Sequence, residues 1–123
     1  MSIPRIPNLQ LIYVSDISKS TEYYTEVFNY EAVFKSPRYV VFTIDGDAQF
    51  AIWSGGDKPD TTIPRFSEIG IMLSSDKDVE DLYQEWQKNS NIEFFKEIHS
   101  DVFGQTFLVK DPDGHIIRVC SVD

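Results

Sequence analysis

The sequence of 123 residues predicts an α+β fold made of two βαβββ modules that form a cupped, mixed sheet. Three observations lead to this prediction. A short apolar segment followed by a helical pattern occurs twice, and each time three segments rich in β-branched and aromatic residues come next. A connector rich in Gly, Pro and small polar residues separates the two halves near the middle of the chain. The chain is long enough for one domain, residues 1–123, with a continuous core.

The first module is expected to span about residues 7–54. Residues 9–14 are rich in strand-forming side chains, and Asp16 can cap the helix that follows, in which Tyr24 and Phe28 are four positions apart. Three further apolar segments, separated by turn-forming residues, are expected to be strands: residues 32–35, 39–44 and 49–53.

The second module is expected over about residues 66–123, after a linker over about residues 55–65. Residues 68–73 form its first predicted strand, and either Ser75 or Asp76 can cap its helix. Three more strands are expected, at residues 93–99, 105–109 and 115–121. The acidic residues of the helix are interpreted most simply as a solvated face: Asp76, Asp78, Glu80, Asp81 and Glu85.

The last two predicted strands are joined by Asp-Pro-Asp-Gly at residues 111–114, where Pro favours a φ of about −65° and Gly accepts a positive φ. In the strand after this turn, Ile117 and Val119 point to one side of the sheet and Arg118 to the other. On the side away from the helices, the first strands of the two modules are expected to present Leu9, Leu11, Tyr13, Glu68, Gly70 and Met72. An arginine therefore projects from a sheet face that also carries apolar residues.

The net charge of −9 argues against nucleic acid as a partner, because the sequence has no basic stripe to neutralise phosphates. Cys120 is the only cysteine, which excludes a disulfide within the chain and a metal site built from several cysteines. No apolar segment approaches the roughly 20 residues that span a bilayer, and residues 1–5 do not resemble a signal peptide. We therefore expect a cytoplasmic protein with no membrane partner.

Two motifs connect the sequence to a known family. Residues 14–24, Val-Ser-Asp-Ile-Ser-Lys-Ser-Thr-Glu-Tyr-Tyr, join a strand to a helix, and Phe103 and Gly104 precede Phe107 and the Asp-Pro-Asp-Gly-His sequence of residues 111–115. In this order, and with the duplicated pattern, they resemble the vicinal oxygen chelate superfamily of glyoxalase I, extradiol dioxygenases, and fosfomycin- and bleomycin-resistance proteins. The resemblance covers nearly the whole chain. It implies the fold and a homodimer, whereas a shared fold leaves the reaction open.

Enzymes of this superfamily hold a divalent metal with His, Gln and Glu side chains from the first and fourth strands of each module. The resemblance places these positions here on Leu9, Ala51, Glu68 and Arg118. Of these only Glu68 can ligate a metal, because the others are two aliphatic side chains and a fixed cation. A shift of the assignment by one residue, to Gln10 or Gln49, would supply a possible ligand. Such a shift moves the side chain to the other face of its strand, so it would need a β-bulge. The sequence therefore predicts no metal and no other cofactor, as in the metal-free bleomycin-resistance-like branch.

The resemblance also sets the first and fourth strands of a module side by side, which would bring Glu68 and Arg118 together as an ion pair. Such a pair either satisfies two charges in a narrow cup or orients a polar group of a ligand. Both interpretations stay open at this point, and Glu68 is also a candidate general base.

Aromatic residues suggest the kind of ligand. Tyr13 and Trp53 share the face away from the helix and could contact a flat molecule by stacking or cation–π contact, whereas core packing is the simpler role for Phe42. The predicted ligand-binding residues are Leu9, Tyr13, Phe42, Ala51, Trp53, Glu68, Met72, Phe103 and Arg118.

The sequence thus favours a metal-independent protein that binds a small molecule, sequestering a planar or cationic compound of antibiotic type. The acidic net charge is the reason to expect a cationic guest. Two alternatives remain at this stage. One is an enzyme of the superfamily (a lyase, transferase or dioxygenase) with a degenerate site that uses Glu68, and the other is a regulatory dimer without a ligand.

Overall fold

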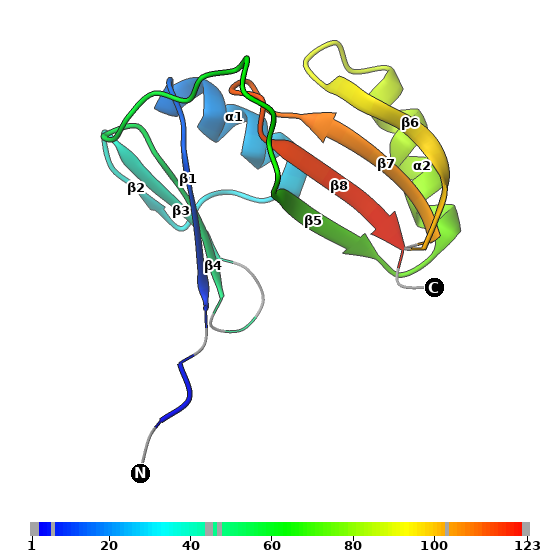
Figure 1. Cartoon of the computed structure of the whole chain (residues 1–123), viewed down its shortest axis with the longest axis horizontal. Coiled ribbons are helices and arrows are strands. Elements are labelled where there is room, and N and C mark those ends of the chain that lie inside the picture. The colour runs from blue at the N-terminus through cyan, green and yellow to red at the C-terminus, as the bar shows by residue number, and fades with distance from the viewer. Residues whose placement is uncertain (1–2, 6, 44–45, 47, 103, 122–123) are drawn as a thin grey trace. The chain divides into compact units, whose positions relative to one another are not determined.

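The structure is a computed structural model, which divides the chain into two compact units, Met1–Pro59 (unit 1) and Asp60–Asp123 (unit 2). Each unit has two layers, a four-stranded sheet and one helix (Figure 1). The α+β fold with a βαβββ order in each half is therefore confirmed. The residues that the structure describes are 3–5, 7–43, 46, 48–102 and 104–121.

Unit 1 contains β1 (Leu9–Tyr13), α1 (Ile17–Phe28), β2 (Phe34–Lys35), β3 (Tyr39–Thr43) and β4 (Gln49–Trp53). The strands lie in the order β1-β4-β3-β2, with β1 parallel to β4 and the other pairs antiparallel. The strand predicted from position 32 is shorter than expected, because β2 pairs with β3 through two residues only before the Ser-Pro turn.

Helix α1 begins as the sequence predicts. The carboxylate of Asp16 accepts a hydrogen bond from the backbone N–H of Lys19 at 3.1 Å, and the helix ends at Asn29 in the left-handed conformation, with φ of 61°. The fully buried Tyr24 packs on Phe50 of β4, with ring centroids 5.0 Å apart. This aromatic contact attaches α1 to one side of the sheet and leaves the other side of the sheet without a helix of unit 1.

Unit 2 repeats the pattern with β5 (Glu68–Leu73), α2 (Asp76–Gln87), β6 (Glu93–Asp101), β7 (Gly104–Lys110) and β8 (Ile116–Ser121). The strand order is β5-β8-β7-β6, and β5 is parallel to β8. Strand β6 is two residues longer than predicted, and its pairing with β7 is interrupted by two register shifts.

Helix α2 is capped by Ser75, whose Oγ accepts a hydrogen bond from the N–H of Asp78 at 3.2 Å; the choice between Ser75 and Asp76 is thereby settled. Trp86 and Tyr83 pack on Phe107 of β7, with ring centroids 5.7 and 5.1 Å away. Neither α1 nor α2, the helices of the described residues, is long and apolar enough to cross a membrane.

The interpretation of Asp76 as part of a solvated face is wrong. Its Oδ1 accepts hydrogen bonds from the backbone N–H of Gln105 at 2.9 Å and from the hydroxyl of Ser121 at 2.6 Å, and these two bonds lower the pKa of the carboxyl. A Cβ at Gly104, where φ is +80°, would overlap with Ser121 Oγ. One carboxylate therefore joins the start of α2 to β7 and to the end of β8.

The turn between β7 and β8 is organised by a buried carboxylate. Asp111 is only 4% exposed, and its Oδ1 accepts hydrogen bonds from the N–H groups of Asp113 at 2.9 Å and His115 at 2.8 Å. The backbone of Asp111 also bonds with Gly114, which has φ of 87°, and with His115. The hairpin predicted from Asp-Pro-Asp-Gly is confirmed, and its first residue supplies the acceptor that closes it.

A candidate ligand-binding site

Glu68 and Arg118 form the ion pair that the sequence predicts. Glu68 begins β5, and Arg118 lies on the neighbouring parallel strand β8, directly opposite Gly70. The guanidinium Nε is 2.6 Å from Glu68 Oε1 and Nη2 is 2.9 Å from Oε2. This bidentate contact with Glu68 is the main cause of a raised pKa for Arg118.

A second carboxylate and a histidine extend this pair toward β6. Asp101 Oδ2 is 4.0 Å from Arg118 Nη1 and 3.5 Å from Nε2 of His99, whose Nδ1 is 2.8 Å from the carbonyl oxygen of Glu97. The pKa of Asp101 is lowered, chiefly because its carboxylate accepts a hydrogen bond from the backbone N–H of Val102. The carboxylates of Glu68 on β5 and Asp101 on β6 therefore both lie near the guanidinium of Arg118 on β8.

Among the described residues, the side chains at the positions that hold the superfamily's metal do not suit a metal ion. Both oxygens of Glu68 accept hydrogen bonds from Arg118, and the described residues contain no group of three His, Cys, Asp or Glu side chains able to hold a metal ion. The bulge that a slip would need is not found between β1 and β4, which pair in one continuous register from Leu9 opposite Gln49 to Tyr13 opposite Trp53. Gln10 lies opposite Phe50, on the strand face that α1 covers.

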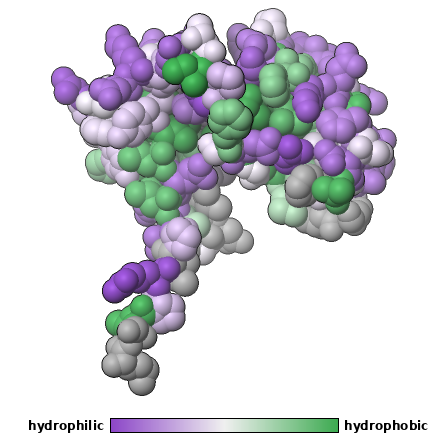
Figure 2. Space-filling model, viewed as in Figure 1, coloured by the Kyte–Doolittle hydropathy of each residue, from purple (hydrophilic) through white to green (hydrophobic). Residues whose placement is uncertain are grey.

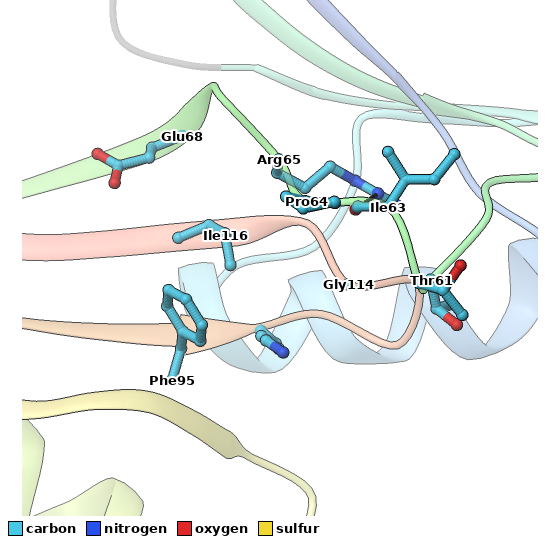
Figure 3. Close-up of a pocket in the computed structure, with 10 residues that line it drawn as sticks. Thr61, Ile63, Pro64, Arg65, Glu68, Phe95, Gly114 and Ile116 are labelled. Atoms are coloured by element: carbon cyan, nitrogen blue, oxygen red, sulfur yellow. Dashed lines mark hydrogen bonds between the residues drawn. The ribbon is translucent and has the colours of Figure 1, made fainter.

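Unit 2 contains a cavity of about 390 Å³ beside Glu68 (Figure 3). Residues 61–65, here called the strap, form one wall, and the ends of the sheet strands form the other. Arg65 attaches the strap to the turn between β7 and β8. Its Nη1 donates hydrogen bonds to the carbonyl oxygens of Asp60 and Ile63 at 3.1 and 2.6 Å, and its Nη2 donates one to the carbonyl oxygen of Asp113 at 2.8 Å. The volume lies within the range of roughly 300–1,000 Å³ usual for small-molecule sites.

The sheet wall of this cavity contains Phe95 of β6, Lys110 of β7 and Ile116 of β8. Figure 3 shows the Phe95 ring beside Ile116, and β7 separates the strands β6 and β8 that carry them. Lys110 Nζ lies 4.9 Å from the centre of the Phe95 ring, which is the geometry of a cation–π contact. Sequence reasoning missed Arg65, Phe95 and Lys110, although the register of the closing hairpin would have set Lys110 beside Ile116.

In unit 1, Tyr13 and Trp53 are neighbours across β1 and β4, with ring centroids 5.1 Å apart and planes at 86°. Tyr13 is 40% exposed. A Cβ at Gly56 would lie 2.7 Å from the Tyr13 ring and 3.0 Å from that of Trp53, so the loop after β4 can approach both rings only with glycine there. Figure 2 shows apolar side chains gathered over the sheet of this unit.

The other predicted ligand-binding residues differ in their surroundings. Leu9 and Met72 are half or more exposed, whereas Ala51 and Phe42 are fully buried. Phe42 packs on Phe28 of α1 with ring centroids 5.5 Å apart, a placement that favours a role in the core. Phe103 lies outside the described residues. The residues that the structure brings together are thus Tyr13 with Trp53 and Glu68 with Arg118.

The chain is similar to known proteins along most of its length. The family model Glyoxalase/Bleomycin resistance protein/Dioxygenase superfamily matches residues 5–119. The phenazine antibiotic resistance protein EhpR of Enterobacter agglomerans is 59% identical over 119 residues, which are 95% of this chain and 92% of that protein.

Solved structures share the fold at low identity. A glyoxalase-related enzyme from Fulvimarina pelagi matches with a TM-score of 0.78 at 19% identity, over 96% of this chain and 88% of its own. A glyoxalase/bleomycin resistance protein/dioxygenase from Nocardioides matches with a TM-score of 0.78 at 18% identity, over 98% of this chain and 85% of its own. The family model, the close relative and the βαβββ units agree: the chain belongs to the glyoxalase/bleomycin resistance protein/dioxygenase superfamily.

Proposed function

We propose that this protein binds a planar antibiotic of the phenazine type and sequesters it without changing it chemically and without a metal. The observation that carries the proposal is the 59% identity to a phenazine antibiotic resistance protein over 95% of the chain. The matched length covers most of both units, and an identity of that extent favours a shared class of ligand.

The chemistry of the candidate site supports this function. A phenazine is a flat aromatic molecule, and the exposed rings of Tyr13 in unit 1 and Phe95 in unit 2, together with the partly buried Trp53 beside Tyr13, are suited to contact such a ring. The cavity of about 390 Å³ beside Glu68 is of ordinary size for a small aromatic guest.

Glu68 is held in place by Arg118, which donates one hydrogen bond to each of its two oxygens. A carboxylate has about four lone-pair sites, so this contact fixes the side chain, and the search for a product described below separates sequestration from the enzyme alternative. The homodimer also remains part of the proposal, supported by the exposure of Leu9 and Leu11 on β1.

Phenazine is expected to bind saturably to the purified protein in isothermal titration calorimetry, and mass spectrometry should recover it unchanged. Trp53→Ala and Tyr13→Ala should each weaken binding by about tenfold, because an aromatic contact contributes roughly 1 kcal/mol beyond its buried area. Tyr30→Ala is the matched control, since Tyr30 is also 40% exposed in unit 1 but packs on Phe28. Absence of saturable binding to the folded wild-type protein would refute the proposal. A new product would instead support an enzyme.

Binding of phenazine is expected to be the same before and after treatment with EDTA, because the residues at the superfamily's metal positions do not suit a metal ion. Nickel, zinc or manganese at micromolar concentration should leave the melting temperature unchanged. A rise of several degrees with any of them would contradict metal independence, since a ligand that binds the native state must stabilise it.

A further inference from the structure

We propose that Trp53 selects planar ligands whose ring edge carries a hydrogen-bond acceptor, such as a ring nitrogen or a carbonyl oxygen, with the indole N–H as the donor. The inference rests on the proposed function and deepens it, because it assigns a required atom of the ligand to one atom of the protein. An aromatic hydrocarbon of the same shape has no such acceptor, so the protein should distinguish the two kinds of molecule.

Trp53 lies on the face of the unit 1 sheet that points away from α1. It is the last residue of β4, in which Phe50 and Ile52 are buried and Phe50 packs on Tyr24 of α1. Because side chains alternate along a strand, Trp53 points to the opposite face, where it is only partly buried. Its neighbour across the strand pair is Tyr13, which is exposed on the same face.

The indole N–H of Trp53 has no hydrogen-bond acceptor among the residues that the structure describes; the contact of this side chain is the ring contact with Tyr13. The Nε1 atom is also not sealed inside the unit, so a ligand can reach it. An indole nitrogen can only donate, and such a donor usually finds a partner when its ring is buried. Trp53 therefore offers a ligand one directed hydrogen bond in addition to its ring.

The loop after β4 approaches this donor with backbone atoms alone. A Cβ at Gly55 would overlap Nε1 of Trp53 and lie 2.8 Å from Cε2, and a Cβ at Gly56 would lie 3.0 Å from Cζ3. The start of the loop is fixed, because the N–H of Ser54 donates to the carbonyl oxygen of Arg38 at 2.9 Å. Any side chain at position 55 would cover the donor atom, and glycine leaves it uncovered.

The arrangement of the two rings allows stacking and the hydrogen bond at the same time. The planes of Tyr13 and Trp53 stand at 86°, with centroids 5.1 Å apart. A flat ligand can therefore stack on Tyr13 and turn one edge toward Trp53. In a phenazine the lone pairs of the ring nitrogens lie in the ring plane and point outward from that edge. The face of the ligand and its edge thus make separate contacts, with Tyr13 and with the indole N–H.

Replacement of Trp53 by benzothienylalanine tests the inference, because a sulfur atom takes the place of the N–H while the fused rings keep their size and shape. The probes are phenazine and anthracene, which share the same ring outline, and only phenazine has acceptors. Fluorescence at sub-micromolar concentration measures both affinities. The preference for phenazine over anthracene should fall about three- to tenfold in the variant, the net effect of one neutral hydrogen bond. The affinity for anthracene itself should change by less than about twofold, because the contact area is kept.

The same replacement at Trp86 is the matched control. Trp86 is buried in unit 2, where its ring packs on Phe107. The control keeps the preference for phenazine if the donor of unit 1 is the one that the ligand uses. Near- and far-ultraviolet circular dichroism of both variants should match the parent, which shows that each is folded.

The outcomes separate this inference from the proposed function. If phenazine binds and its preference over anthracene is unchanged by the replacement at Trp53, the donor assignment is wrong and the binding function stands. If the replacement at Trp86 lowers the preference as much, the effect does not belong to the indole of unit 1 and the inference is overturned. If phenazine does not bind to the folded wild-type protein, the proposed function fails, and the inference fails with it.

Discussion

Gly104→Ala is expected to destabilise the protein by about 2–4 kcal/mol. Gly104 has φ of +80°, a conformation that costs an L-residue roughly 1–2 kcal/mol. The added Cβ would also overlap Ser121 Oγ and lie 2.9 Å from Asp76 Oδ1. These two atoms form a hydrogen bond of 2.6 Å, so relief of the overlap requires that bond to lengthen or break, at a further cost of about 1–2 kcal/mol.

Two other glycines separate the backbone cost from the steric cost. Gly46 has φ of +75° and open space around its Cβ position, so Gly46→Ala should show the backbone cost alone, about 1–2 kcal/mol. Gly70 also has open space and no positive φ, so Gly70→Ala should be neutral or slightly stabilising. Urea unfolding at constant m-value measures all three. Equal losses in Gly104→Ala and Gly46→Ala would show that the overlap at Ser121 contributes nothing.

The parts of the site that the sequence predicts depend on strand pairing alone. A parallel pair of strands with one buried face determines which side chains share the other face, and this suffices to place Glu68 beside Arg118. The same reasoning pairs Tyr13 with Trp53, because β1 and β4 repeat the arrangement of β5 and β8. The alternation of side chains along each strand, together with the expectation that the first and fourth strands of a module are neighbours, therefore predicts both pairs.

The parts that sequence reasoning missed depend on contacts between distant loops and strand ends. Asp76 lies among acidic residues at helical spacing, and nothing in that pattern indicates that Gln105 and Ser121 donate hydrogen bonds to it. Arg65 stands in a Gly- and Pro-rich connector, where a surface position is the ordinary expectation, yet it bonds to the turn at Asp113. Such contacts follow from the path of the chain in space, and no periodicity in the sequence encodes that path.

Asp111→Ala is expected to have a comparably large effect, about 2–4 kcal/mol of lost stability. The substitution removes the acceptor of two N–H groups, of Asp113 and His115, and the first of these hydrogen bonds is fully buried. A buried donor left without an acceptor costs roughly 1–3 kcal/mol. Asp111→Asn is the matched variant, because its amide oxygen can still accept both bonds, and it should lose less than half as much in urea unfolding.

The same substitution should also weaken ligand binding, because the turn of Asp111 carries the carbonyl of Asp113 to which Arg65 attaches the strap. If the strap is a wall of the binding cavity, Asp111→Ala should bind phenazine several-fold more weakly at a temperature where it is fully folded, and Asp111→Asn should bind nearly as the parent does. Arg65→Met should reproduce the loss of binding with a smaller loss of stability, since its bonds to the strap carbonyls are exposed. Unchanged affinity in both Asp111→Ala and Arg65→Met would show that the ligand does not touch the strap, and the cavity would then have to be replaced by the Tyr13 and Trp53 face as the principal binding surface.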